Sequence, residues 1–408
     1  MARILGHRVA ESLAGRRDAA AGWLDWRRER RGHPLIWLHA ASVGEALTAD
    51  PVLRRLRTAI PAADVMLTHT SPSVSRWPHS LVADHVGYLP PGDRRTMDAL
   101  FAHLQPVVVV FARSDLWPGL VAAARRHSVP AILLGGTVRP GSTRLLPPVR
   151  AALRRTYACL RWVGAVSPED ADRLRRLGVP GGAIHVTGDP RHDQILERSV
   201  SLTPAQEILR WTGGDPVLVA GSTEPDDEEV VLRAYQIVAA RWPRARLVIA
   251  PHEPAPDRTR QLLDAADSHG LHAAVLGAGA PEDTRVLLNR GLGMLADLYL
   301  AATMAYVGGG LRKGGLHTVA EPAAWAVPVM FGDCGGRPPT DASRLVARGG
   351  GVSLPLAGAA DRLAEQWIRW LDDPPSTRRA GLAARATLRG GAADETARAI
   401  LQFCRKKR

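Results

Sequence analysis

The chain has 408 residues, more than the roughly 250–300 at which one hydrophobic core stops growing, so two domains are expected. Its residues are 46% hydrophobic and 23% charged, a balance that excludes wholesale disorder. The 53 basic and 40 acidic residues give a net charge of +13, which favours an anionic partner such as nucleic acid, a membrane surface or a phosphorylated substrate.

The positive charge is almost entirely arginine. Lysine occurs only at Lys313, Lys406 and Lys407, and asparagine only at Asn289. We interpret this as a compositional bias, so part of the net charge has no specific meaning. The three cysteines, at positions far apart in the sequence, are Cys159, Cys334 and Cys404. Their spacing predicts neither a disulfide nor a zinc site, and it indicates a protein of a reducing compartment.

Residues 1–32 are predicted to be a basic amphipathic helical segment. Apolar residues, including Trp23 and Trp26, alternate there with many arginines. This composition is typical of a membrane-surface helix, but it also fits a helix packed on its own domain with a solvated arginine face. The longest apolar runs, such as 107–111, have the length of a strand, so no membrane-spanning helix or signal peptide is expected.

A first series of strands and helices is predicted over residues 33–200. A helix is expected over 44–59, and another should begin at Ser167, where an N-cap serine precedes a proline and two acids. The predicted strands are 35–40, 65–68, 107–111, 131–134 and 162–166.

A second series is predicted over residues 201–408. The stretch 189–215 is rich in proline and glycine, which places the domain junction there. Residues 341–372 and 376–403 are expected to be helices. The predicted strands are 217–221, 247–250, 304–307 and 327–331.

Alternating strands and helices predict an α/β protein with parallel sheets covered on both faces. Two Rossmann-like halves in a chain of this length indicate the two-domain GT-B architecture, with the active site in a central cleft between the halves. Ligands of such sheets bind at the carboxyl ends of the strands, near helix N-termini.

The first candidate motif is residues 39–45, which run from a strand end into a helix start. Ser42 and Glu45 have the spacing of a capping box, in which each side chain satisfies a free N–H group of the helix. Glu45 could instead be a general base that deprotonates an acceptor hydroxyl, and Gly44 would let the acceptor approach the backbone. The spacing leaves both interpretations open.

Three further motifs follow strand ends. Asp115 is either a helix-start acid or an active-site carboxylate. Residues 221–226 could bind an anion at a helix N-terminus or form an ordinary N-cap. His252 could contact a phosphate or a base, although a single loop histidine is more often solvated.

The longest motif is residues 306–324. A strand ends in three glycines, Arg312 and Lys313 follow, and a helix is expected to carry His317 and Glu321. Glycine-rich backbone before a helix cradles phosphate, and Glu321 could accept both ribose hydroxyls. A flexible loop and a capped helix are the alternative. A metal at His317 and Glu321 is rejected because no third ligand is near in the sequence.

Together and in this order, these motifs resemble the Kdo transferase family, which transfers 3-deoxy-D-manno-octulosonic acid (Kdo) from CMP-Kdo to a lipid A precursor. The resemblance covers residues 33–350. The matching segments are 37–45, Leu116-Trp117-Pro118, 187–193, Gly221-Ser222-Thr223, Pro251-His252-Glu253 and 308–321.

The resemblance implies a role for each matched residue. Glu45 corresponds to the family's proposed base, and Asp115 is the second catalytic candidate. Residues expected to bind the acceptor or Kdo are Ser42, Gly44, Arg139 and Arg191. Residues expected to bind the CMP of the donor are Ser222, Thr223, His252, Met294, Gly309, Lys313, His317 and Glu321.

The resemblance further implies an inverting, metal-independent glycosyltransferase without a cofactor, acting peripherally at the cytoplasmic face of the bacterial inner membrane. Its partners would be CMP-Kdo, a lipid A precursor (lipid IVA) and an anionic membrane surface, and no nucleic acid. Arg113 stands where the family has Glu, and Thr137 where it has Arg. The alternatives are a relative with another acceptor or donor, an inactive membrane-associated paralogue, or a nucleic-acid binder.

Overall fold

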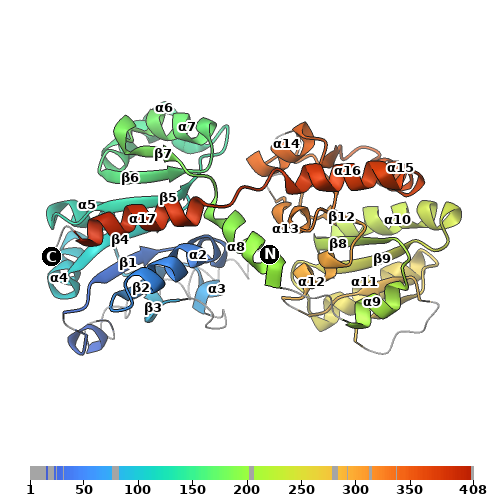
Figure 1. Cartoon of the computed structure of the whole chain (residues 1–408), viewed down its shortest axis with the longest axis horizontal. Helices are drawn as coiled ribbons and strands as arrows, with labels where there is room; N and C mark the ends of the chain where they lie inside the picture. Colours follow the sequence, from blue (N-terminus) through green and yellow to red (C-terminus); the bar gives the residue numbers. More distant parts are fainter. Residues whose placement is uncertain are drawn as a thin grey trace. The chain divides into compact units, whose positions relative to one another are not determined.

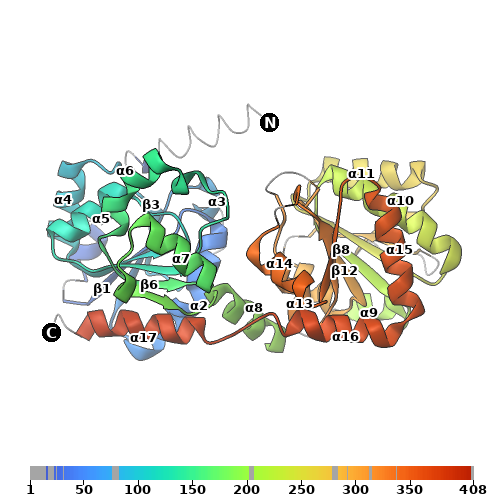
Figure 2. The same ribbon diagram turned by 90° about the horizontal axis from the view of Figure 1, so that it is seen from above.

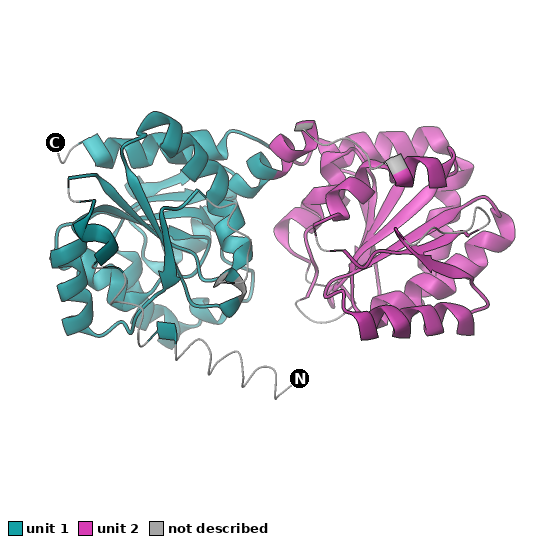
Figure 3. Ribbon diagram, turned by 90° about the horizontal axis from the view of Figure 1, so that it is seen from below, with its two compact units in different colours: residues 1–194, 389–408 teal, residues 195–388 magenta. Residues whose placement is uncertain are grey.

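A computed structural model describes residues 15–16, 23, 25–30, 32–75, 82–201, 206–277, 284–291, 293–311, 315–336 and 338–405. The chain divides into two compact units, coloured separately in Figure 3. Unit 1 comprises residues 1–194 and 389–408, and unit 2 comprises residues 195–388.

Unit 1 is built on a seven-stranded, wholly parallel sheet, shown in Figures 1 and 2. In spatial order its strands are β3 (His85–Tyr88), β2 (Asp64–His69), β1 (Leu35–His39), β4 (Pro106–Ala112), β5 (Ala131–Gly136), β6 (Leu160–Ala165) and β7 (Ile184–Val186). Its helices are α2 (Val43–Ala59), α3 (Pro72–Ser75), α4 (Arg94–Leu104), α5 (Pro118–Arg126), α6 (Pro147–Tyr157), α7 (Pro168–Leu177) and α17 (Ala392–Arg405), with short 3-10 turns at Thr143–Leu145 and Gly181–Ala183.

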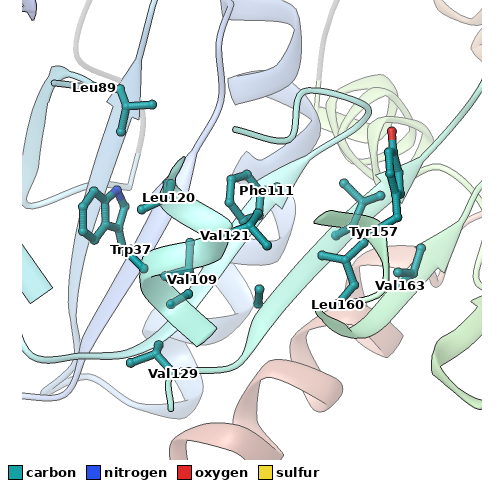
Figure 4. Packing of buried hydrophobic residues seen from close by; sticks show 14 of the residues in the cluster. Trp37, Leu89, Val109, Phe111, Leu120, Val121, Val129, Tyr157, Leu160 and Val163 are labelled. Carbon is teal, nitrogen blue, oxygen red and sulfur yellow. The ribbon is translucent and has the colours of Figure 1, made fainter. Parts of the chain in front are cut away.

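The strands of unit 1 are apolar on both faces because helices cover both. Trp37 and Val109 pack into one core cluster, shown in part in Figure 4, whereas their neighbours Leu38 and Val110 pack into the cluster on the opposite face. Successive side chains of a strand point to opposite faces, so a continuous apolar run is what a doubly covered parallel strand requires.

Unit 2 repeats this plan with a second parallel sheet of seven strands. In spatial order they are β10 (Ala273–Val275), β11 (Val286–Leu288), β9 (Arg246–Pro251), β8 (Val217–Thr223), β12 (Met304–Val307), β13 (Val329–Gly332) and β14 (Gly351–Leu354). Its helices are α9 (Gln206–Thr212), α10 (Pro225–Arg241), α11 (Pro256–Ser268), α12 (Leu295–Leu300), α13 (Ala320–Ala324), α14 (Thr340–Ala347), α15 (Ala359–Asp372) and α16 (Pro374–Arg385), while α8 (Pro190–Ser201) spans the division between the units.

The predicted α/β class with two parallel sheets is confirmed, and the division at residue 194 falls inside the predicted junction 189–215. Ser167 caps α7, since its hydroxyl accepts a hydrogen bond of 3.0 Å from the Asp170 N–H. The single helix predicted over 341–372 is wrong. It is interrupted by β14, because a glycine-rich turn at 349–351 ends α14 and begins a strand that pairs with β13.

Residues 389–408 were expected in the second domain, but the structure assigns them to unit 1. Helix α17 buries its apolar face, including Ile400, in the unit 1 core. Its N-terminus is held by Asp193, whose carboxylate accepts hydrogen bonds from the N–H groups of Gly391 (2.6 Å) and Ala393 (3.0 Å). The position of a helix in the fold depends on where its apolar face can be buried, not on its order in the chain.

Most of the predicted 1–32 segment lies outside the described residues. Of the described part, Trp23 is only 2% exposed and packs edge-on against Trp37, with the ring centroids 5.8 Å apart. The buried Arg27 forms an ion pair of 3.2 Å with Asp64. These residues therefore follow the alternative of a segment packed on its own domain. No helix in the described ranges is long and apolar enough to cross a membrane.

Candidate active site

The two predicted catalytic carboxylates of unit 1 follow neighbouring parallel strands. Glu45 lies in the first turn of α2, just after β1, and Asp115 follows β4. Because the strands are parallel and paired, both residues lie at the carboxyl edge of the sheet, where α/β proteins bind ligands. The structure also gives them an electrostatic interaction with each other.

The predicted capping box is not formed as a reciprocal pair of Ser42 and Glu45. The Glu45 carboxylate accepts a hydrogen bond of 2.6 Å from the Ala41 N–H, whereas the Ser42 side chain makes no capping bond. Glu45 is therefore anchored at the helix start but is not engaged in the reciprocal pair that the spacing allows.

The environments of the two carboxyls push their pKa values apart. Burial, and next to it the negative charge of Asp115, raise the pKa of Glu45 to about 7. Burial alone would raise the pKa of Asp115 as well, but its interactions with His39 and Trp117 outweigh burial and lower it. A carboxyl that titrates near neutral pH beside one that stays ionised is the arrangement expected of a general base and a fixed anion.

A buried polar network supports Asp115. The Trp117 ring N–H donates a hydrogen bond of 3.1 Å to its Oδ2, and Nε2 of the fully buried His39 lies 3.9 Å from the same oxygen. His39 Nδ1 is 3.1 Å from the Thr68 hydroxyl. Burial lowers the pKa of His39. Sequence reasoning gave His39 no role, although it opens the motif that contains Glu45.

A second feature missed from the sequence is the ion pair of Arg113. Its Nη1 donates a hydrogen bond of 2.8 Å to Oδ2 of Asp189, a residue only 3% exposed, and Oδ1 of Asp189 accepts from the Arg191 N–H at 2.9 Å. Arg113 has a φ of 60°, in the left-handed region. It also lowers the pKa of Glu45, against the larger effect of burial.

The residues expected to bind the acceptor all lie at this carboxyl edge of unit 1. Ser42 and Gly44 are at the start of α2, Arg139 follows β5 and Arg191 follows β7. A Cβ placed on Gly44 would meet no atom within 4 Å, so the backbone there is open to approach. Arg139 is exposed.

In unit 2, predicted donor residues gather after β8 and β9 and in the loop that follows β12. The rings of His252 and His317 are in contact, with centroids 4.0 Å apart, and the Thr223 carbonyl accepts from the His252 N–H at 3.0 Å. Thr223 is only 2% exposed and its hydroxyl donates to Glu228 at 3.0 Å, so this side chain holds the loop. Ser222 has a left-handed φ of 52°.

Two glycines of the run 308–310, Gly308 and Gly309, do not present open N–H groups, contrary to the expectation from the sequence. Gly308 donates to the Gly221 carbonyl (3.0 Å) and Gly309 to the Asp227 carboxylate (2.8 Å). The glycines are required for close packing instead, since a Cβ on Gly309 would lie 2.1 Å from the Gly315 carbonyl oxygen. Gly309 therefore shapes the loop that carries His317.

The prediction that His317 and Glu321 share a helix is also wrong. Helix α13 begins only at Ala320, and His317 lies in the preceding loop, where its N–H donates to the Gly308 carbonyl at 3.1 Å. Glu321 is in the first turn of α13 and interacts electrostatically with Tyr299. Met294 precedes α12 and packs on the unit 2 core. Lys313 lies outside the described residues.

In the folded chain His317 does have neighbouring side chains that could bind a metal, contrary to the expectation from the sequence. One ligand atom each from Glu224, His252 and His317 lies within 4.8 Å of the others. A tetrahedral zinc with bonds of about 2.1 Å would need these atoms roughly 3.4 Å apart. The metal-free mechanism stays a prediction.

Comparison with known proteins identifies the family. The sequence profile described as "3-Deoxy-D-manno-octulosonic-acid transferase (kdotransferase)" matches residues 15–194. The 3-deoxy-D-manno-octulosonic acid transferase of Bordetella pertussis is 30% identical over 370 residues, which cover 85% of this chain and 81% of that one. The chain belongs to the 3-deoxy-D-manno-octulosonic acid transferase family. The transferase of that name from Haemophilus influenzae is 26% identical over 303 residues, covering 73% and 70% of the two chains.

Solved structures support the fold of this Kdo transferase family member. The UDP-GlcNAc 2-epimerase of Neisseria meningitidis matches with a TM-score of 0.64 at 16% identity, covering 90% of this chain and 100% of the other. A glycosyltransferase from Rickettsia africae matches with a TM-score of 0.60 at 11% identity, covering 92% and 98%. At these identities the likeness concerns the two-domain GT-B-type fold alone.

Proposed function

We propose that this member of the Kdo transferase family transfers Kdo from CMP-Kdo to a lipid A precursor such as lipid IVA, with inversion, in lipopolysaccharide biosynthesis. The observation that carries the proposal is the Glu45–Asp115 pair: a carboxyl with a pKa of about 7 held beside a carboxyl whose pKa is lowered. A sugar transfer to an alcohol needs such a base near neutral pH.

In the proposed step, the Glu45 carboxylate accepts the proton of the acceptor hydroxyl as that oxygen attacks the anomeric carbon of Kdo. The bond from that carbon to the phosphate oxygen of CMP breaks on the opposite face, so the configuration inverts and CMP leaves with the bonding electron pair. The Asp115 carboxylate raises the proton affinity of Glu45, and the Ala41 N–H fixes its orientation.

Unit 2 would hold the donor. His252 and His317 are in contact at the carboxyl edge of its sheet, where an anionic phosphate is expected to bind. Glu321 is the candidate for the ribose hydroxyls, and Ser222 and Lys313 for polar contacts with the nucleotide. The leaving phosphate would be stabilised by side-chain donors rather than by a metal ion.

The acceptor is a phosphorylated lipid, so the proposal places the protein peripherally at the cytoplasmic face of the inner membrane. The net charge of +13 favours an anionic surface, because each basic residue near it contributes about 1 kcal/mol. Arg139 and Arg191, on the acceptor edge of unit 1, are candidates for the acceptor phosphates or the Kdo carboxylate.

The decisive test is incubation of the purified chain with CMP-Kdo and lipid IVA, with mass spectrometry of the product. We expect a product heavier by one or more Kdo groups, and a rate reduced at least 100-fold in Glu45→Gln. The matched control, Glu365→Gln, changes an exposed carboxylate of α15 in unit 2 and should keep the wild-type rate. An undiminished rate in Glu45→Gln would contradict the base assignment. Transfer from a UDP-sugar instead would show a different donor.

A further inference from the structure

One cavity of the described part of unit 1 lies away from the proposed active site. It has a volume of about 830 Å³ and lies in unit 1 around the beginnings of β4, β5 and β6, where Val107, Ala131 and Leu160 line it. Glu45 and Asp115 are at the opposite, carboxyl edge of the same sheet. A strand of seven residues such as β4 separates the two edges by about 20 Å.

The walls of this cavity combine an apolar interior with a cationic rim. The partly exposed Val107 and Phe403 form its accessible apolar wall. Behind them, Val121, Val129 and Leu160 also line the cavity and belong to the buried core cluster that Figure 4 shows. Arg125, Arg155 and Arg161 also line it. No aspartate or glutamate does, within the part of the chain that the structure describes.

The three arginines are available to a ligand. All three are exposed, and among the described residues none makes an ion pair or a side-chain hydrogen bond. Arg125 and Arg155 lie in the last turns of α5 and α6, where the helix dipole favours a cation. That preference does not explain Arg161, which is in β6 and adds a third positive charge to the same rim.

We propose that this cavity binds an anionic phospholipid, with the phosphate on Arg125, Arg155 and Arg161 and the first methylenes of the acyl chain on the apolar wall. Guanidinium groups bind phosphate by charge-assisted, often bidentate hydrogen bonds. A volume of 830 Å³ is in the range of small-molecule sites, and an apolar interior with a few convergent polar groups is their usual composition. The site is separate from the transfer reaction and does not rest on it.

Cys159 provides a probe of occupancy at the site. It lines the cavity and is partly exposed, whereas Cys334 and Cys404 are buried, and burial raises the pKa of the Cys404 thiol to about 11. A thiol-alkylating reagent should therefore modify Cys159 first, and a lipid seated in the cavity should slow that reaction.

The experiment titrates the full chain with lysophosphatidylglycerol below its critical micelle concentration, by calorimetry and by the alkylation rate of Cys159. We expect saturable binding, at least fivefold slower alkylation, and binding weakened roughly tenfold or more in Arg125→Gln/Arg161→Gln. The matched control, Arg95→Gln/Arg233→Gln, removes the same charge from two exposed arginines outside the cavity and should bind as the wild type does.

Further variants and ligands show whether binding depends on the cavity, on the phosphate or on the acyl chain. Ala158→Trp fills the mouth of the cavity at an exposed position without changing charge, and should also abolish the protection of Cys159. Equal binding of lysophosphatidylcholine, equal binding of glycerol 3-phosphate without a chain, unprotected Cys159, or an unaffected double arginine variant would each overturn the proposal.

Discussion

The guanidinium of Arg113 donates a hydrogen bond of 2.8 Å to the carboxylate of Asp189, which is 3% exposed. The two residues are 76 positions apart in the sequence and meet at the carboxyl edge of the unit 1 sheet. The positive charge of Arg113 is thus balanced by a buried negative charge. It also adds a cation to the electrostatic environment of Glu45.

Removing Arg113 should destabilise unit 1. Arg113→Ala leaves the buried Asp189 without its cation, and we expect a loss of about 3 kcal/mol in the free energy of unfolding, measured by urea denaturation. The control Arg175→Ala breaks an exposed pair with Asp172 and should cost less than about 1 kcal/mol. If both variants lose the same amount, the Arg113–Asp189 pair carries no special weight.

The same pair predicts a pH dependence of stability. Burial would raise the pKa of Asp189, but the charges of Arg113 and His192 outweigh the effect of burial, so the pKa is lowered. The contribution of ionised Asp189 to the free energy of unfolding is therefore fully present above the pKa of an unfolded aspartate, about 3.9. This stabilisation is lost as the pH falls through the lower pKa of Asp189 in the folded state. We expect the difference in Tm between wild type and Arg113→Ala to narrow between pH 5 and pH 2.

The acid side of the activity profile should report Glu45. Because the pKa of Glu45 is about 7, kcat/KM should reach half its maximum near pH 7 and level off about one pH unit higher. Asp115→Asn removes the negative charge that is the second cause of the raised pKa, so the midpoint should move to lower pH by roughly half a unit to one unit. A midpoint unchanged in Asp115→Asn, with Asp98→Asn as the control, would show that the two carboxyls are not coupled.

The ionised form of Glu45 should lower the free energy of unfolding at alkaline pH. An acid whose folded pKa lies above its unfolded value contributes fully below about pH 4.5, and that contribution is lost as the pH rises to about 7. Glu45→Gln should therefore be more stable than wild type at pH 8, by about 1–2 kcal/mol in the free energy of unfolding, and should have a higher Tm. At pH 4 the two Tm values should be equal. Equal Tm values at pH 8 would contradict the raised pKa.

Trp23 tests the packing of the N-terminal segment. Its ring is 2% exposed against Trp37, so Trp23→Ala should destabilise unit 1 by about 3–5 kcal/mol in thermal unfolding without any membrane present. The control Leu146→Ala truncates a side chain that is 53% exposed and should have little effect. A Tm unchanged in Trp23→Ala would show that this residue does not hold the domain together.

The donor site can be tested through CMP alone. His317→Ala should weaken CMP binding about tenfold, the effect of losing one charge-assisted contact, while the exposed His272→Ala should not. Prior dialysis against EDTA should leave the Kd unchanged. A Kd that rises after EDTA and recovers with zinc would instead show that Glu224, His252 and His317 hold a metal.

The sequence by itself determined the two α/β halves. Apolar runs such as 107–111 are long enough for a strand and too short for a buried helix, and local rules of capping correctly placed the start of α7 at Ser167. The junction near residue 194 followed from proline and glycine, which disfavour regular structure. These features depend on neighbours a few residues away, which a sequence shows directly.

Only the tertiary structure decided what distant residues do to one another. It returned α17 to unit 1, set Arg113 on Asp189, and brought His252 against His317. It also raised the pKa of Glu45, because burial and the charge of Asp115 depend on packing and not on spacing along the chain. The same holds for the positive charge. Composition gives the number of arginines, but only the fold shows which arginines are buried in ion pairs and which remain exposed.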